Sequence, residues 1–329
     1  MMRALVLGAT GQLGANLVRV LLAKGDEVRA LIRPSSKAIT LREVELERIP
    51  GDLNDPNSVI RACQGMDIVY HAAAYYPHSN ISGEAATSQA LQETNNVLEA
   101  VRQCSVPRLV FTSTLTTIGF PAKSGQLANE TCPFSTAFPD NPYLASKVAM
   151  EEAVLKAARN GIPGIVLNPT AFFGPFDSQP TSGTQIILIA KQQMPVYIDG
   201  PLNVIDVRDV AIAHIQAAER GRIGERYIIG NWNTSQKSLN QLIAKVASVP
   251  APSFPVPFSV ARFGSKLGDW ASRNLLHKPP SIPGFFVEVF KHFQYYDCSK
   301  GLRELDYPQS PIEPAIRASL HWFRENGYV

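Results

Sequence analysis

The feature that most constrains this chain is a set of three glycines at the end of its first apolar segment. Arg3–Leu7 is typical of a short strand, and Gly8, Gly11 and Gly14 follow it and open an apolar-periodic stretch over Leu13–Ala23. Glycines at this spacing allow a tight turn, close approach of the backbone to a diphosphate, and close packing of helix on strand. The first turn of the helix would offer free N–H groups to the anion. An ordinary strand-to-helix turn is the plainer alternative. The predicted cofactor-binding residues of this turn are Gly8, Thr10, Gly11, Gln12, Leu13 and Gly14.

Short apolar runs alternate with amphipathic stretches through the first half of the chain. This alternation is typical of β-α-β units and predicts an α/β fold with a doubly wound, parallel Rossmann sheet. The segments predicted as strands are Arg3–Leu7, Glu27–Ile32, Glu45–Ile49, Asp67–His71, Arg108–Thr112, Gly164–Leu167, Asn203–Val207 and Arg226–Ile229. The segments predicted as helices are Leu13–Ala23, Asn57–Cys63, Ala85–Gln103, Tyr143–Arg159, Thr184–Gln193, Val210–Ala218, Ser259–Asn274 and Ile312–Arg324.

The regular alternation weakens after Pro169, and this change suggests two parts. Residues 1–170 are predicted to form the dinucleotide-binding domain, with residues 203–230 threaded back into it. Residues 171–202 and 231–329 are predicted to form a smaller substrate-binding lobe.

Composition argues against several other classes of protein. With 45% apolar and 18% charged residues the chain can bury a sizeable core, and its net charge of +3 includes no dense basic run. Neither a nucleic-acid partner nor a membrane partner is therefore expected. The four cysteines lie far apart and the six histidines have no ligand spacing, which argues against disulfides or a metal site and favours a reducing compartment. No segment has the pattern of a signal peptide or a membrane span, so a cytoplasmic protein is expected.

The end of the second predicted strand bears on the choice of cofactor. An acidic side chain there would bind the ribose 2′-hydroxyl of NAD, whereas an arginine suits the 2′-phosphate of NADP. The strand ends in Ile32-Arg33, and the acids Asp26 and Glu27 lie at its opposite end. An ordinary surface charge is the alternative interpretation of Arg33. The sequence predicts NADP, with NAD less favoured.

A tyrosine and a lysine one helical turn apart form the predicted catalytic pair, Tyr143 and Lys147. A free tyrosine has a pKa near about 10, so it works as an acid–base catalyst near neutral pH only where a cation favours the phenolate. The pair follows a strand that ends in Phe111-Thr112-Ser113-Thr114, and ligands bind at the carboxyl ends of strands in open α/β sheets. The predicted catalytic residues are Thr114, Tyr143 and Lys147.

The same spacing occurs a second time, at Tyr296 and Lys300. This pair lies far downstream of the predicted sheet edge, and Asp297 and Ser299 beside it are residue types that cap a short helix. We therefore expect a structural role for the second pair.

With the glycine turn, Thr114, Tyr143 and Lys147 in this order, the chain resembles the extended short-chain dehydrogenase/reductases, a group that includes the NAD-dependent epimerase/dehydratases. The likeness covers essentially the whole chain. Within the group it is most similar to dihydroflavonol-4-reductase-like reductases, in which an arginine after the second strand meets the NADP phosphate, and to the hopanoid-associated sugar epimerase type. The resemblance implies further cofactor contacts at Asp52, Leu53, Ala72, Ala73, Ala74 and Pro169, beside Tyr143 and Lys147.

Two positions depart from the family's pattern. The family often has an asparagine in its long fourth helix that helps a proton relay, and this chain has Ala90 there, so the relay is not carried over. Nucleotide-sugar epimerases tend to present an arginine to the substrate diphosphate where this chain has Leu202. A diphosphate without a cationic partner is costly to bury, so Leu202 favours an uncharged substrate.

The resemblance implies reversible hydride transfer between NADP and a carbonyl or alcohol carbon. Tyr143 would exchange the hydroxyl proton, Lys147 would lower the pKa of Tyr143 and hold the nicotinamide ribose, and Thr114 would orient the substrate oxygen. The alternative function is that of a nucleoside-diphosphate-sugar epimerase or dehydratase. A redox-sensing regulator is a further alternative, but it would not need the Tyr143 and Lys147 pair.

Aromatic residues, among them Tyr76 and Phe138, are frequent in the loops that would frame the substrate. They predict an apolar pocket for a small molecule, although each ring could equally anchor a loop. The resemblance also implies a homodimer formed through residues 85–103 and 143–159. The predicted substrate residues are Tyr75, Phe172 and Phe173.

Overall fold

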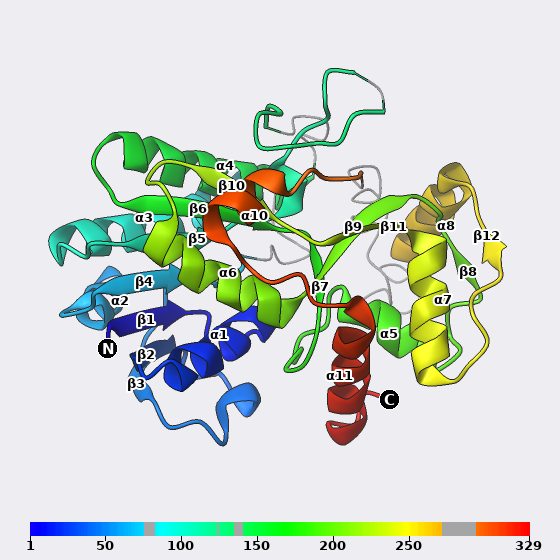
Figure 1. Ribbon diagram of the computed structural model, residues 1–329, viewed down its shortest axis with the longest axis horizontal. Helices are drawn as coiled ribbons and strands as arrows, with labels where there is room; N and C mark the ends of the chain where they lie inside the picture. The colour runs from blue at the N-terminus through cyan, green and yellow to red at the C-terminus, as the bar shows by residue number, and fades with distance from the viewer. Residues whose placement is uncertain (76–82, 124, 135–140, 272–293) are drawn as a thin grey trace.

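The computed structural model describes residues 1–75, 83–123, 125–134, 141–271 and 294–329 (Figure 1). Its centre is a seven-stranded sheet in which every strand is parallel to its neighbours, with the order β10-β6-β5-β4-β1-β2-β3. This arrangement confirms the predicted doubly wound α/β fold. The strands of this sheet are β1 (Arg3–Leu7), β2 (Glu27–Ile32), β3 (Glu47–Pro50), β4 (Ile68–His71), β5 (Leu109–Thr112), β6 (Gly164–Pro169) and β10 (Arg226–Ile229).

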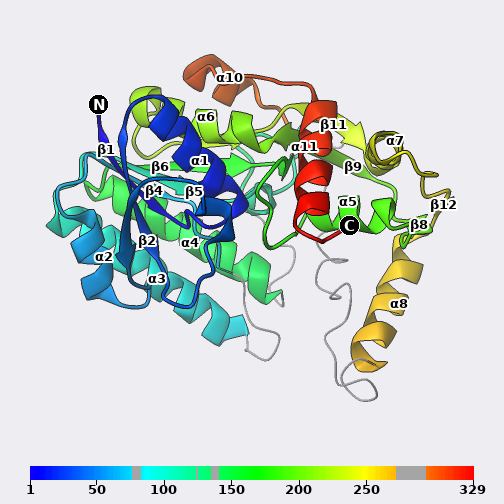
Figure 2. The same ribbon diagram turned by 90° about the horizontal axis from the view of Figure 1, so that it is seen from below.

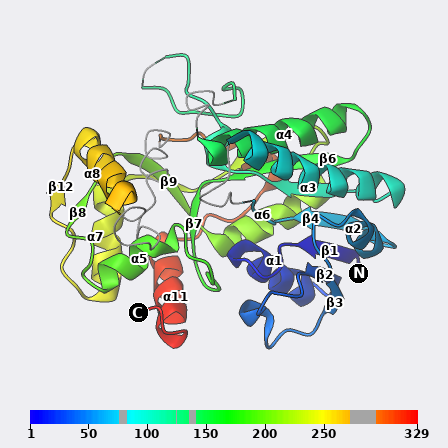
Figure 3. The same ribbon diagram turned by 180° about the vertical axis from the view of Figure 1, so that it is seen from behind.

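Helices cover both faces of the sheet (Figure 2). On one face lie α1 (Gln12–Ala23) and α6 (Val207–Arg220), and on the other α2 (Pro56–Cys63), α3 (Gly83–Gln103) and α4 (Pro142–Arg159). Figure 3 shows α3 and α4 packed side by side.

Strand β1 shows how the sequence builds these two layers. Successive side chains of a strand point to opposite faces. Ala4 and Val6 accordingly join the core under α1 and α6, whereas Leu5 and Leu7 join the core under α2, α3 and α4. All four are fully buried, and each large apolar side chain contributes about 1.5–3 kcal/mol.

A second, three-stranded sheet lies beside the first, on the right in Figure 1. It has its own apolar core, here called the second core, which includes Phe173, Ile186, Leu239, Ile316 and Phe323. The elements around the second core are β7 (Ala171–Phe173), β9 (Pro201–Asp206), β11 (Trp232–Ser235), α5 (Gly183–Ala190), α7 (Gln236–Ala247) and α11 (Ile312–Glu325). The remaining elements are η1 (Ile39–Leu41), η2 (Leu115–Thr117), β8 (Val196–Tyr197), β12 (Phe254–Pro255), α8 (Phe258–Ala271) and α10 (Ser299–Leu305).

One part of the predicted threading is wrong. Residues 203–230 were expected to return to the large sheet, but β9 runs parallel to β7 and antiparallel to β11 in the second sheet. Only α6 and β10 of that span join the large sheet and its helical layer. The physical reason is that Leu202 and Val204 of β9 pack in the second core. Helix α6 starts as soon as β9 ends, because the Asp206 carboxylate accepts a hydrogen bond from Arg208 N at 2.8 Å.

Helix α7 was not predicted at all. Its signals are local: Ser235 Oγ accepts a hydrogen bond from Ser238 N at 3.1 Å, and Leu239, Ile243 and Ala247 recur every fourth residue along the buried face. Polar residues such as Asn240, Gln241 and Lys245 stand between these three positions and make the helical spacing harder to recognise.

Candidate active site

The site is built where the strand order of the large sheet reverses, between β1 and β4. Open α/β sheets bind ligands in the crevice at this point, outside the carboxyl ends of the strands. The glycine turn follows β1 and Ala72-Ala73-Ala74 follows β4, and a β-carbon on Gly8 would lie 2.5 Å from the backbone nitrogen of Ala73. The fold therefore brings these two predicted cofactor segments into contact.

The three glycines of the turn meet different steric demands. Gly8 has φ of 85°, which L-residues with side chains rarely adopt. A β-carbon on Gly14 would lie 2.2 Å from the carbonyl oxygen of Gly8, so helix and strand pack too closely there for any side chain. A β-carbon on Gly11 would have only that same oxygen nearby, at 3.4 Å.

Helix α1 begins with Gly11 as its N-cap, and no side chain caps its first turn. The N–H groups of this first turn and the positive end of the helix dipole can therefore serve an anion. The turn has the shape and the donors that a dinucleotide diphosphate requires.

The adenosine end of the predicted site lies beyond β2 and β3. Arg33 is exposed directly after β2. Asp52 accepts a hydrogen bond from Asn54 N at 2.9 Å, and Asn96 Nδ2 donates to the carbonyl of Leu53 at 2.7 Å. These two hydrogen bonds hold the segment that contains Asp52 and Leu53 in place.

Glu93 on α3, which was not predicted from the sequence, lies near this end of the site. Asn54 Nδ2 donates to its carboxylate at 3.2 Å. Burial raises the pKa of the Glu93 carboxyl, while the hydrogen bonds from Asn54 and Gln89 and the Arg33 charge act in the opposite direction.

The predicted catalytic pair occupies the first two turns of α4. The helix starts at Pro142 because Asn141 Oδ1 accepts hydrogen bonds from Tyr143 N at 3.1 Å and Leu144 N at 3.2 Å. Lys147 follows one turn later, is only 6% exposed, and places Nζ 5.7 Å from the centre of the Tyr143 ring.

Burial shapes the protonation of the groups around this pair. It lowers the pKa of the Lys147 ammonium to about 8, although the charge of Glu93 acts in the opposite direction. It also lowers the pKa of His71 to about 4, with a smaller contribution from Lys147. His71 is therefore neutral near pH 7, and the local cation is Lys147.

Thr114 lies at the edge of the sheet directly after β5 and caps the short helix η2. The Thr114 hydroxyl accepts two long hydrogen bonds, from Thr116 N and Thr116 Oγ1 at 3.4 Å each. Pro169 ends the neighbouring strand β6, so Thr114 and Pro169 belong to adjacent strand ends. Helix α4 packs against η2 and thus brings the tyrosine's helix beside Thr114.

Comparison with known proteins identifies this framework. Residues 4–230 match the model of the NAD dependent epimerase/dehydratase family. The chain belongs to this family. The resemblance to the extended short-chain dehydrogenase/reductases is thereby confirmed, as is the prediction of an enzyme that uses a nicotinamide cofactor.

Relatives in the epimerase/dehydratase family that match the whole chain have different activities. A Synechocystis protein assigned as a dihydroflavonol 4-reductase is 36% identical over 334 residues, which cover 98% of this chain and 95% of the relative. Sterol demethylase protein B of Methylococcus capsulatus is 29% identical over 330 residues and is covered completely, as is this chain. The structure of a nucleoside-diphosphate-sugar epimerase from Pseudomonas aeruginosa has a TM-score of 0.83 at 29% identity, with 99% of both chains covered.

The second tyrosine–lysine pair has separate structural partners within the family fold. Tyr296 is buried and donates to the carbonyl of Leu115 at 3.2 Å. Lys300 Nζ donates to Glu225 at 2.7 Å and to the carbonyl of Arg226 at 2.8 Å. These contacts agree with the structural role expected for this pair.

The predicted substrate residues lie in different surroundings. Tyr75 is buried and donates to Gln89 Oε1 at 3.3 Å, and Phe172 is half-buried against the core under α1 and α6. Phe173 is 1% exposed and packs in the second core, as does Leu202. Tyr76 and Phe138, two further rings noted in the sequence, lie outside the described residues.

A second acid that was not predicted from the sequence is Glu151, which is buried on α4. It accepts hydrogen bonds from hydroxyl and amide groups at the ends of β5 and β6 and pairs with Arg226. Its sequence signal is an acid one turn after Lys147 on the buried face of the helix.

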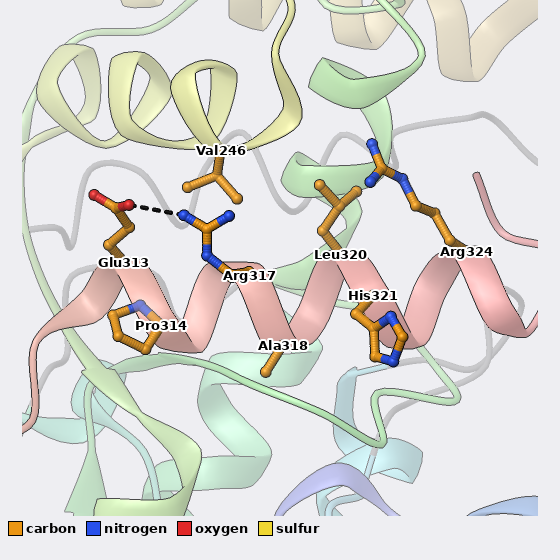
Figure 4. Close-up of a pocket in the computed structure, with 8 residues that line it drawn as sticks. All are labelled: Val246, Glu313, Pro314, Arg317, Ala318, Leu320, His321 and Arg324. Carbon is orange, nitrogen blue, oxygen red and sulfur yellow. Dashed lines mark hydrogen bonds and ion pairs between the residues drawn. The ribbon is translucent and has the colours of Figure 1, made fainter.

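A surface hollow lies away from these residues, between α7 and α11 (Figure 4). Arg317 Nη2 donates to Glu313 at 2.9 Å there, and Lys245 also pairs with Glu313. None of the predicted catalytic or cofactor residues lines this hollow, which consists of Val246, Glu313, Pro314, Arg317, Ala318, Leu320, His321 and Arg324.

In the part of the chain that the structure describes, no three His, Cys, Asp or Glu side chains gather closely enough to hold a metal ion. Within the same ranges, every helix is too short or too polar to cross a membrane.

Proposed function

We propose that this protein is an NADP-dependent reductase that transfers hydride reversibly between the cofactor and a carbonyl carbon. The observation that carries the proposal is the position of Tyr143 and the buried Lys147 on one end of α4. Helix α4 packs against η2, which Thr114 caps at the carboxyl edge of the sheet.

Tyr143, Lys147 and Thr114 would each have a separate role in the reaction. The Tyr143 hydroxyl gives its proton to the carbonyl oxygen during reduction and takes it back during oxidation. The Lys147 charge favours the phenolate form between turnovers. Thr114 donates a hydrogen bond to the same substrate oxygen and orients it. A bound nicotinamide supplies or accepts the hydride.

Arg33 supports the choice of NADP over NAD. It is exposed directly after β2, where a ribose 2′-phosphate would lie in this fold, and the chain has no acid at that end of the strand to bind a 2′-hydroxyl. Its guanidinium can make two parallel charge-assisted hydrogen bonds to a phosphate. The glycine turn would hold the diphosphate.

An uncharged, apolar carbonyl compound fits this chain better than a nucleotide sugar. Leu202 is buried in the second core at a place where a diphosphate-binding enzyme would need a cation. The names of two relatives, a dihydroflavonol 4-reductase and a sterol demethylase protein, also point to ring compounds without phosphate.

The runner-up function is nucleotide-sugar epimerisation. It is favoured by the close structural likeness to the Pseudomonas epimerase. A panel of aromatic ketones, aliphatic ketones and nucleotide sugars separates the two functions when NADPH loss and product identity are followed together. We expect NADPH loss with a ketone; sugar isomerisation without NADPH loss would overturn the proposal.

A further inference from the structure

Glu151 is a buried carboxylate on the same helix as the catalytic pair. It follows Tyr143 by eight residues and Lys147 by four, so all three lie along one side of α4. Its side chain is 0% exposed. One oxygen, Oε2, accepts hydrogen bonds from Ser113 Oγ, from Thr117 Oγ1 at 2.6 Å and from Asn168 Nδ2 at 2.7 Å.

The other oxygen of Glu151 faces a cation. Arg226 Nη1 lies 3.2 Å from Oε1, and the Arg226 side chain is 11% exposed. The remaining guanidinium donors bind the carbonyls of Glu130 and Cys132. A buried ion pair is stable only when each member has such partners, and here both have them.

Three residues of this network adjoin the backbone of Thr114. Ser113 is the residue before it. Asn168 Nδ2, which donates to Glu151, also lies 3.2 Å from the Thr114 carbonyl. The Thr117 hydroxyl has two acceptors, Glu151 at 2.6 Å and the Thr114 carbonyl at 2.8 Å, but only one proton. The carboxylate charge draws that proton to Glu151.

We propose that Glu151, held by Arg226, is a positioning residue that keeps the turn carrying Thr114 in register with the helix carrying Tyr143. Glu151 does not touch the substrate. It acts through Ser113, Thr117 and Asn168. It thereby fixes the distance between the Thr114 and Tyr143 hydroxyls, so that both can reach the same substrate oxygen. The inference rests on the proposed roles of Thr114 and Tyr143.

Substitution of Glu151 by Gln keeps the size of the side chain and removes the charge. An amide group then faces at least one donor of the network, and the Thr117 hydroxyl is free to turn to the Thr114 carbonyl. We expect kcat to fall by about 10- to 100-fold, because a small misplacement of a reacting group has that effect. NADPH binding should change by less than about twofold, because the glycine turn lies on another strand.

The test compares Glu151→Gln with Glu152→Gln, which removes an exposed carboxylate at the next position of α4. Both are assayed for kcat, KM and NADPH affinity well below their unfolding temperatures. Glu151→Gln and Arg226→Met, combined, should be less harmful than the sum of their separate effects on kcat, because they disrupt one pair. A kcat for Glu151→Gln equal to that of Glu152→Gln overturns the proposal, as does lower stability with unchanged kcat per folded molecule.

Two further variants keep the outcome clear. If Glu151→Gln does not fold, Ser113→Ala removes a single donor from the carboxylate, and an unchanged kcat in that variant overturns the proposal. Tyr143→Phe separates this inference from the proposed function. An inactive Tyr143→Phe beside a fully active Glu151→Gln refutes only the positioning role, whereas an active Tyr143→Phe refutes the proposed chemistry itself.

Discussion

The ammonium nitrogen of Lys147 lies 5.7 Å from the centre of the Tyr143 ring, and the Lys147 side chain is almost completely buried. Burying an ammonium costs free energy unless it is paired or hydrogen-bonded. Here the charge lies one helical turn from a phenol whose ionised form it would stabilise in the proposed mechanism. The buried position of Lys147 therefore has two consequences. It lowers the stability of the folded protein, and it provides the charge that the proposed catalysis by Tyr143 needs.

The first prediction concerns the dependence of stability on pH. Burial lowers the pKa of Lys147 from 10.5 to about 8. Between these values the unfolded chain binds the Lys147 proton and the folded chain does not, so the contribution of Lys147 to the free energy of unfolding increases as pH rises. Below about pH 8 that contribution is at its most unfavourable.

Urea unfolding of wild type and Lys147→Met at about pH 7 and about pH 10 checks this sign. We expect the variant to gain stability relative to wild type at the lower pH and to lose that relative gain at the higher pH. A stability difference that does not change with pH contradicts the lowered pKa.

The second prediction concerns the glycine turn. Gly14→Ala places a methyl group 2.2 Å from the Gly8 carbonyl, so we expect a loss of about 1–3 kcal/mol in the free energy of unfolding. Gly11→Ala meets only that same oxygen, at 3.4 Å, and should fold nearly normally. In the proposed binding mode its methyl group occupies the space of the diphosphate, so NADPH affinity should fall by about tenfold or more.

Gly200→Ala is the matched control for both glycine variants, because a β-carbon at Gly200 would have no atom within 4 Å. Thermal unfolding and NADPH titration of the three proteins provide the comparison. Normal NADPH affinity in Gly11→Ala would show that the diphosphate does not lie on this turn.

The third prediction concerns cofactor selectivity at Arg33. Arg33→Ala removes the proposed partner of the 2′-phosphate, so the affinity for NADPH should fall by about 10- to 100-fold. The affinity for NADH should stay nearly unchanged, because NADH has no such phosphate. Lys37→Ala, an exposed cation in the following loop, controls for general charge. An equal loss for both cofactors in Arg33→Ala would mean that Arg33 does not read the phosphate.

Much of the nucleotide-binding half was predictable because its signals are local. The apolar runs predicted all seven strands of the large sheet, β1 to β6 and β10. The start of α4 follows from Asn141 and Pro142, which satisfy and shape the first turn. The glycine spacing predicts a turn directly after the first strand, and in the structure this strand, β1, lies at the switch point beside β4.

The parts that could not be predicted depend on contacts between distant segments. Glu151 and Arg226 are 75 residues apart, and they meet only because β10 pairs with β6. The strand β9 has the same apolar pattern whichever sheet it joins. Phe172 and Phe173 point to opposite sides of β7, and only the packed structure shows that Phe173 belongs to the second core.

The most direct test of the proposed chemistry is the turnover of Tyr143→Phe with a ketone identified by the substrate panel. This substitution removes one oxygen atom and leaves the ring beside Lys147. We expect kcat to fall by at least about 100-fold, with NADPH affinity nearly unchanged. Tyr227→Phe, which removes a hydroxyl that donates to Glu304 at 3.0 Å away from this site, should keep nearly full activity. Turnover of Tyr143→Phe close to that of wild type would contradict the assignment of Tyr143 as the acid–base catalyst.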